Sequence, residues 1–224
     1  MDFRKVWLEA SPMLLQGTMT TMTISVIAIV IGTVIGLVLC VMRASRYKCF
    51  RSAAKIHVWM IRSTPMILQA FIIYFGLPQL AQYLWKGFTI PVYMASVITL
   101  SINSGAYLSE IFRAGINAVG RGQVEASVSL GLPQSVTMRR VVLPQAFRII
   151  LPSMVNQFVI LIKDTSVLSV IGLADLMNRG RTYVGASYQF FATYTLISAY
   201  YCAIISLLII ASKCIEKRYS VCQE

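Results

Sequence analysis

A long charge-free stretch near the start of the chain constrains its fold more than any other feature. Between Gly17 and Met42 there is no Asp, Glu, Lys or Arg, and most of the residues are apolar. A helix of about 20 apolar residues is long enough to cross the roughly 30 Å hydrocarbon layer of a bilayer. A helix also satisfies its backbone hydrogen bonds without water, which that layer requires. The stretch therefore predicts a membrane-spanning helix.

Four further apolar stretches follow, at about 65–84, 91–112, 149–173 and 190–211. Hydrophobic residues make up 57% of the 224 residues and charged residues only 12%. So few charges could not keep the surface of a water-soluble domain of this size in solution. We therefore expect an all-α integral membrane protein, a single domain over residues 1–224 with five transmembrane helices.

The positions of the basic residues predict the orientation of these helices. With the N-terminus outside, the inner segments 43–62, 113–150 and 213–224 hold 6, 5 and 3 of the 20 Lys and Arg residues. The outer segments hold 5, and Lys163 lies within a span. Because cytoplasmic loops carry the excess of Lys and Arg, we expect the N-terminus outside and the C-terminus in the cytoplasm.

The net charge of +12 and the composition exclude several other functions. The basic residues lie in short segments between apolar stretches, which is typical of membrane protein loops and argues against nucleic-acid binding. The single histidine, His57, has no carboxylate or second histidine near it, and the five cysteines form no CxxC pair. There is no Gly-rich phosphate loop. We expect no catalytic, cofactor-binding or metal site, and any ATP would be bound by another chain.

The segment 113–148 is too long for an ordinary connection between helices. Its sequence predicts one short helix over Val124–Leu130, ended by Gly131-Leu132-Pro133. It predicts a second helix over Gln134–Val142, ended by Leu143-Pro144. Such a helical hairpin on the inner face would suit docking into a groove on a cytoplasmic partner.

Residues of this hairpin resemble the EAA signature, the coupling helix with which ABC importer permeases meet their ATPase. The match consists of Glu125-Ala126-Ser127, Gly131, Val141 and Leu143-Pro144 at the spacing of the signature, with Ser127 where Ala is usual and Val141 where Ile is usual. Three longer stretches are similar to the polar amino-acid permeases, the histidine/glutamine/cystine type. They are RSTPMILQAFIIYFGLP at 62–78, AYLSEIFRAGINAV at 106–119 and LPQAFRIILPSMVNQFVILIKDTSVLSVIGLADL at 143–176.

This resemblance implies the type I ABC importer permease fold and import of a polar amino acid, with glutamine, histidine, arginine and cystine as candidates. It also implies partners: a dimer of ATPase subunits, a second permease chain (identical or a sister) and an extracytoplasmic solute-binding protein. The location would be the cytoplasmic (inner) membrane of a bacterium. The residues expected to couple the chain to the ATPase are Glu125, Ala126, Ser127, Gly131, Leu143 and Pro144.

Polar residues inside the predicted spans suggest where the solute passes. Ionisable residues in hydrocarbon usually face the interior of a bundle or a cavity. Helical spacing places the candidates on one face of the third span and on adjoining faces of the fourth: Asn103, Tyr107, Glu110, Asn156, Gln157, Lys163 and Asp164. The alternative is a structural role, in which Glu110 pairs with Arg113 and Lys163 and Asp164 pair with neighbouring helices.

Two other functional classes remain open at this point. A transporter driven by an ion gradient would need no ATPase, so it leaves the 113–148 hairpin unexplained. A non-transporting scaffold or export-apparatus subunit leaves the polar residues inside the spans unexplained. A membrane enzyme is disfavoured because no nucleophile, base and metal can be assembled from the sequence.

Overall fold

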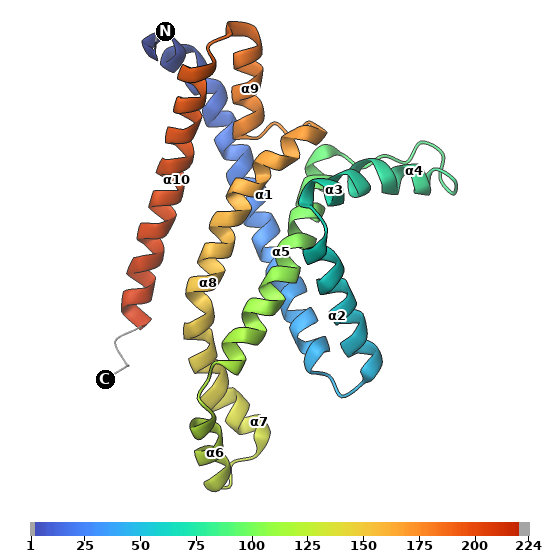
Figure 1. The fold of residues 1–224 in the computed structure, drawn as a ribbon, viewed down its shortest axis with the longest axis vertical. Coiled ribbons are helices and arrows are strands. Elements are labelled where there is room, and N and C mark those ends of the chain that lie inside the picture. Colours follow the sequence, from blue (N-terminus) through green and yellow to red (C-terminus); the bar gives the residue numbers. More distant parts are fainter. Residues whose placement is uncertain (1–2, 220–224) are drawn as a thin grey trace.

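The computed structural model describes residues 3–219, with side chains to Lys213, and all regular structure in this range is helical (Figure 1). Two π-helical turns and one 3-10 helix interrupt the α-helices. The elements are α1 Phe3–Ala44, α2 Lys48–Ser63, α3 Met66–Phe71, η1 Ile72–Gly76, α4 Leu77–Ala81, α5 Val92–Asn117, α6 Arg121–Ser129, α7 Gln134–Thr137, η2 Met138–Val142, α8 Leu143–Asp164, η3 Thr165–Ile171, α9 Leu176–Ser187 and α10 Phe190–Tyr219.

The first and third predicted spans lie within α1 and α5, which pack closely along their length. Small residues allow this approach, since glycine carries no side chain to separate two helix backbones. A β-carbon placed on Gly36 would lie 2.9 Å from Cβ of Leu108 and 3.1 Å from the carbonyl oxygen of Gly105. One placed on Gly32 would clash with Oγ of Ser104. Gly32 and Gly36, four residues apart, therefore allow close contact between two helices of the same chain.

The region predicted as the second span, 65–84, is helical from Met66 to Ala81, through α3, η1 and α4. The helical chain breaks at Thr64-Pro65, where both residues are extended, and α2 and the α3–α4 segment meet at 108°. Proline has no amide hydrogen and disfavours the helical conformation in the residue before it, which explains the break. Helix α2 packs back against α1 and α5 and buries Ala54, Val58 and Ile61.

The second helix of the 113–148 hairpin does not end at Leu143-Pro144 as predicted. It continues through α7, η2 and α8 because the wide π-helical turn at Met138–Val142 precedes the proline. A proline inside a helix lacks a donor and clashes with the carbonyl four residues earlier, and a wider turn relieves both problems. The same combination occurs at Ile72–Gly76, just before Leu77-Pro78.

The segment between the fourth and fifth predicted spans contains the helix α9, which carries Arg179 and Arg181. Asp175 caps its N-terminus, where its carboxylate accepts hydrogen bonds from the amides of Met177 and Asn178 at 3.2 and 3.0 Å. Carboxylates at this position satisfy amides that have no partner inside the helix. The cap is buried against α1, because the amide of Leu176 donates to Oγ1 of Thr21.

Length and composition mark three segments of the described chain as candidate membrane spans: α1, 134–171 and 190–213. The bent pair formed by α2 with the α3–α4 segment makes a fourth if it counts as one span. The third predicted span, in α5, is not among them. That helix carries many polar residues, including Ser101, Asn103, Ser104 and Ser109, which are buried by its neighbours α1 and α8.

Candidate functional site

A cavity of about 400 Å³ opens where α3, α5 and α8 meet beside the break after α2. Four of the seven predicted solute-path residues line it: Asn103, Tyr107, Gln157 and Asp164. The rest of its wall is formed by Thr64, Pro65, Met66 and Ile160. We call this space the solute cavity. Its lining combines amide, phenol and carboxylate groups with apolar side chains, which is typical of small-molecule sites.

Gln69 of α3, a residue that the sequence reasoning missed, holds the wall of the solute cavity in place. Its Nε2 donates to the carbonyl oxygen of Ile61 at 2.8 Å, and to the carbonyl oxygen and Oγ1 of Thr64 at 3.1 and 2.9 Å. Its Oε1 accepts a hydrogen bond from Nδ2 of Asn103 at 3.0 Å. One buried amide therefore connects the broken segment to α5. The sequence offered one sign of this role: Gln69 follows closely after Ser63-Thr64-Pro65, where the proline predicts a break in the helix.

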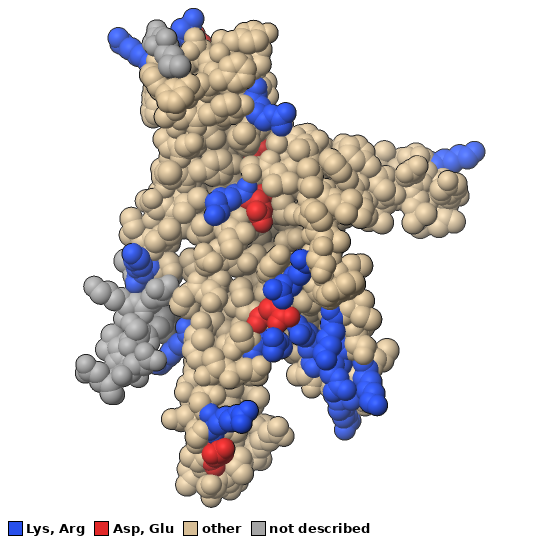
Figure 2. All heavy atoms as spheres, in the orientation of Figure 1, with Lys and Arg blue, Asp and Glu red and all other residues tan. Residues whose placement is uncertain are grey.

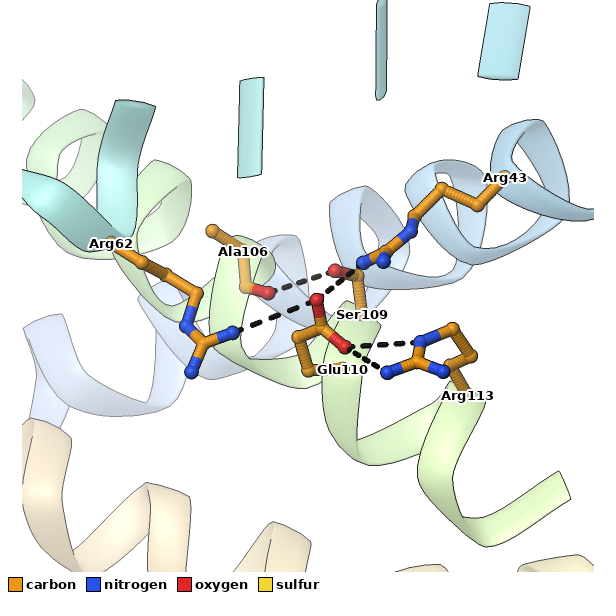
Figure 3. A network of polar contacts seen from close by, with 6 residues as sticks. All are labelled: Arg43, Arg62, Ala106, Ser109, Glu110 and Arg113. Atoms are coloured by element: carbon orange, nitrogen blue, oxygen red, sulfur yellow. Dashed lines mark hydrogen bonds and ion pairs between the residues drawn. The ribbon is translucent and has the colours of Figure 1, made fainter. Parts of the chain in front are cut away.

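The other three predicted residues lie outside the solute cavity. Asn156 and Lys163 are exposed on α8 in this single chain. Glu110 forms ion pairs with arginines from α1 and α5 (Figure 3). Its Oε1 accepts from Nη1 of Arg43, and its Oε2 accepts from Arg113 at 2.8 and 3.0 Å. The predicted pairing of Glu110 with Arg113 is therefore confirmed.

The sequence reasoning did not anticipate the tertiary partners of Glu110. Arg43 follows the first span and is separated from Glu110 by 67 positions. A third guanidinium, that of Arg62, lies with Nη1 3.6 Å from Oε1 of Glu110 and stands over the ring of Tyr107 at 5.3 Å from its centroid. The only signal in the sequence was that segment 43–62 has six basic residues and no acidic one.

The predicted coupling residues lie at the end of the molecule opposite α9 (Figure 1). Helix α6 ends in a tight turn in which the amide of Leu132 donates to the carbonyl of Ser127 at 3.1 Å, and that of Gly131 to the carbonyl of Val128 at 2.9 Å. This arrangement needs a left-handed residue after the helix, and Gly131 has φ +77°. Five of the six predicted coupling residues are exposed: Glu125, Ala126, Gly131, Leu143 and Pro144.

Ser127, which replaces the usual Ala of the signature, is buried in α6. Its Oγ donates to the carbonyl oxygen of Gln123 at 2.8 Å, so the hydroxyl is satisfied within its own helix. The substitution therefore leaves the outer surface of the hairpin unchanged. Over the described side chains, no group of three or more His, Cys, Asp and Glu residues lies close enough together to hold a metal ion.

Comparison with known proteins shows the family to which the chain is similar. The model of the binding-protein-dependent transport system inner membrane component matches residues 36–221. The chain is 39% identical to the arginine transport system permease protein ArtQ of Bacillus subtilis (strain 168), over 92% of each chain. It is 38% identical to the putative glutamine transport system permease protein GlnP of Rickettsia felis, over 93% of each.

Solved structures agree with these relatives. A crystal structure of an amino acid ABC transporter with histidines superposes with a TM-score of 0.91 and 35% identity, covering 97% of this chain and 99% of that one. An inward-facing MetNI methionine ABC transporter shares the fold, with a TM-score of 0.76 at 18% identity over 98% of this chain and all of that one. The chain thus belongs to the binding-protein-dependent transport system inner membrane components, the permease subunits of ABC importers.

Proposed function

We propose that this chain carries a polar amino acid across the inner membrane, in a complex whose ATPase is a separate subunit. The relatives with the highest identity among those described above are named for arginine and glutamine transport, and the closely superposing structure is of an amino acid transporter. The observation that carries the proposal is the solute cavity, in which Asn103, Gln157 and Asp164 meet from two helices. Membership of the family argues against the ion-gradient transporter and the scaffold.

The chemistry of the solute cavity suits a zwitterion. The carboxylate of Asp164 would pair with the ammonium group of the amino acid. The amides of Asn103 and Gln157 and the hydroxyl of Tyr107 offer hydrogen bonds to its polar atoms. Both amide side chains are buried, so water competes little for them. Charged groups are costly in hydrocarbon, and Asp164 is most easily explained by a cationic partner of this kind.

We also propose five spans with the N-terminus outside. Helices α1, α5, α8 and α10 would provide four, and α2 together with α3–α4 a broken second one. The distribution of charge supports this orientation. Figure 2 shows Lys and Arg gathered over the half of the molecule that carries α2 and the α6–α7 hairpin. That half would face the cytoplasm, where an excess of basic residues is expected.

Coupling to the ATPase would pass through α8. The helical path from Gln134 to Asp164 is continuous, through α7, η2 and α8. One end therefore belongs to the exposed hairpin with Glu125 and Gly131, and the other carries Gln157 and Asp164 of the solute cavity. A movement imposed on the hairpin by an ATPase would shift the cavity wall directly.

Transport by a reconstituted complex tests the proposal. The permease would be purified with its ATPase and solute-binding protein and placed in liposomes, and ATP-dependent uptake of labelled L-arginine, L-glutamine and L-histidine measured. We expect Asp164→Asn to reduce uptake about tenfold, a change of about 1.4 kcal/mol, because the variant loses the charge that pairs with the ammonium group. Asn156→Ala, on the same helix but outside the cavity, is the control. Equal uptake by the two variants and the wild type would overturn the proposed site.

A further inference from the structure

A second cavity, of about 440 Å³, lies between α1, α2 and α5 next to the solute cavity. Its charged lining residues are Arg43, Lys55, Arg62 and Glu110. Tyr107 is part of the wall of both cavities. The two spaces therefore share one aromatic wall residue. Nothing in the proposed function so far makes use of the second one.

The charges around the second cavity do not balance. Its lining holds three cations and a single carboxylate. That carboxylate is already occupied, because Oε1 of Glu110 accepts from Arg43 and Oε2 accepts twice from Arg113 (Figure 3). Arg62 lies farther away, at 3.6 Å, and 45% of its side chain is exposed. Lys55 has no carboxylate within 4 Å among the described side chains.

Two cations are thus available to an incoming anion. A guanidinium binds a carboxylate through two parallel hydrogen bonds, and an ammonium group adds a compact charge. Arg62 also stands over the ring of Tyr107, which holds its charge beside the shared wall. An anionic group beside Tyr107 would therefore lie close to Arg62.

We propose that the second cavity is a further solute site, in which Arg62 and Lys55 bind the carboxylate of the transported amino acid. The proposal rests on the proposed function. The two cavities then complement opposite ends of one zwitterion, because Asp164 is the ionisable group of the first and Arg62 and Lys55 are the available ions of the second. A solute released past Tyr107 would exchange a contact through its ammonium group for one through its carboxylate.

The same cations could hold the phosphate of a lipid headgroup, because basic pockets on the cytoplasmic side of membrane proteins bind such groups. The shared wall favours the solute. Arg62 is oriented by Tyr107, which also lines the solute cavity. A lipid site would have no need of that connection.

Binding stoichiometry tests the proposal on the intact complex in lipid nanodiscs without ATP. Equilibrium dialysis with labelled L-arginine, or with L-glutamine, should find two molecules per wild-type permease chain and one for the double variant Lys55→Gln/Arg62→Gln. Agmatine, which is arginine without its carboxylate, should bind as one molecule per permease chain in both the wild type and the double variant. The control Lys86→Gln/Arg121→Gln removes the same charge outside both cavities and should keep two. One molecule per wild-type chain, or the same number in wild type and variant, overturns the second site.

Two further measurements separate this result from its alternatives. ATP-dependent uptake by the wild type reports on the proposed function alone, so uptake with only one bound molecule refutes the second site and leaves the transporter. Binding is then compared in nanodiscs of phosphatidylcholine and in discs containing phosphatidylglycerol. If the anionic lipid removes the binding that depends on Lys55 and Arg62, the cavity is a headgroup site and the proposal is wrong. Two molecules in both lipids support it.

Discussion

Asn103 on α5 donates a hydrogen bond from Nδ2 to Oε1 of Gln69 on α3, over 3.0 Å and with both side chains buried. Because Gln69 also donates to the carbonyl oxygens of Ile61 and Thr64, this one bond links the α2–α3 break to the central helix. A broken helix inside a membrane protein needs such replacement partners for its free backbone groups. The geometry of the solute cavity therefore depends on a residue outside its lining.

Replacement of Gln69 by Leu should destabilise the protein. It would leave the carbonyls at the break and the amide of Asn103 without their partner, and each buried unpaired group costs about 1–3 kcal/mol. The thermal unfolding midpoint of the detergent-solubilised protein should fall by several degrees. Gln82→Leu is the matched control, because Gln82 makes a single exposed hydrogen bond to the carbonyl of Phe88. Equal midpoints for both variants would show that the break needs no internal partner.

The packing of α1 against α5 predicts opposite effects for two Gly→Ala substitutions. In an open helix this change stabilises by roughly 0.5–1 kcal/mol, and Gly185 on α9 has no atom within 4 Å of the added carbon. At Gly36 the new carbon would lie 2.9 Å from Cβ of Leu108, which forces the helices apart at a cost of roughly 1–3 kcal/mol. Unfolding midpoints should therefore rise or stay level for Gly185→Ala and fall for Gly36→Ala. A rise for both would contradict the close packing.

Replacing Gly131, which follows the end of α6, should weaken the coupling of ATP turnover to the solute. Gly131 has φ +77°, where an alanine is strained by roughly 1–2 kcal/mol, although no neighbour obstructs its side chain. In Gly131→Ala we expect solute-stimulated ATP turnover of the reconstituted complex to fall several-fold, with solute binding unchanged. Gly122→Ala, within α6 at a residue without a positive φ, serves as the control. Normal turnover in Gly131→Ala would argue against a coupling role for this turn.

Reversing the charge of Glu125 tests the same hairpin without straining its backbone. The side chain is exposed on α6, so Glu125→Lys should leave the free energy of unfolding within about 0.5 kcal/mol of the wild type. If Glu125 meets an ATPase, stimulated turnover should nevertheless fall. Unchanged turnover in this variant would place the ATPase contact elsewhere.

Stability should depend on pH through Asp175, which lies outside the proposed spans. Burial raises the pKa of this carboxyl to about 6, against an ordinary 3.8, despite the amides of Asn178 and Met177. The folded state holds the proton more tightly, so this contribution is complete below pH 3.8 and is lost as the pH rises through about 6. The loss amounts to about 3 kcal/mol at most.

The variant Asp175→Asn isolates this effect, because asparagine also caps helices but does not ionise. Unfolding midpoints of both proteins would be measured between pH 4 and 7.5. The wild type should lose stability relative to the variant as the pH rises, most steeply between the ordinary pKa of 3.8 and the raised pKa of about 6, and the difference should level off above 6. A constant difference across this range would mean that the carboxyl titrates normally.

Local properties of the sequence were enough for the class of the protein. Runs of apolar residues without charge predict helices that lipid can surround, and the positions of Lys and Arg predict an orientation. The short helix before Gly131 was also predictable, because a left-handed turn after a helix strongly favours glycine. The residues of the EAA signature then pointed to the family that the comparisons show.

Other features depended on contacts between distant parts of the chain. Asn103 and Gln157 could be placed on helix faces, but only the packing of α5 against α8 brings both to one cavity. Glu110 had the spacing of a solute-path residue, yet Arg43, 67 positions earlier in the chain, engages it instead. Helical periodicity shows which side of a helix a residue occupies. Which element packs against that side is set by interhelical contacts, and these exist only in the folded structure.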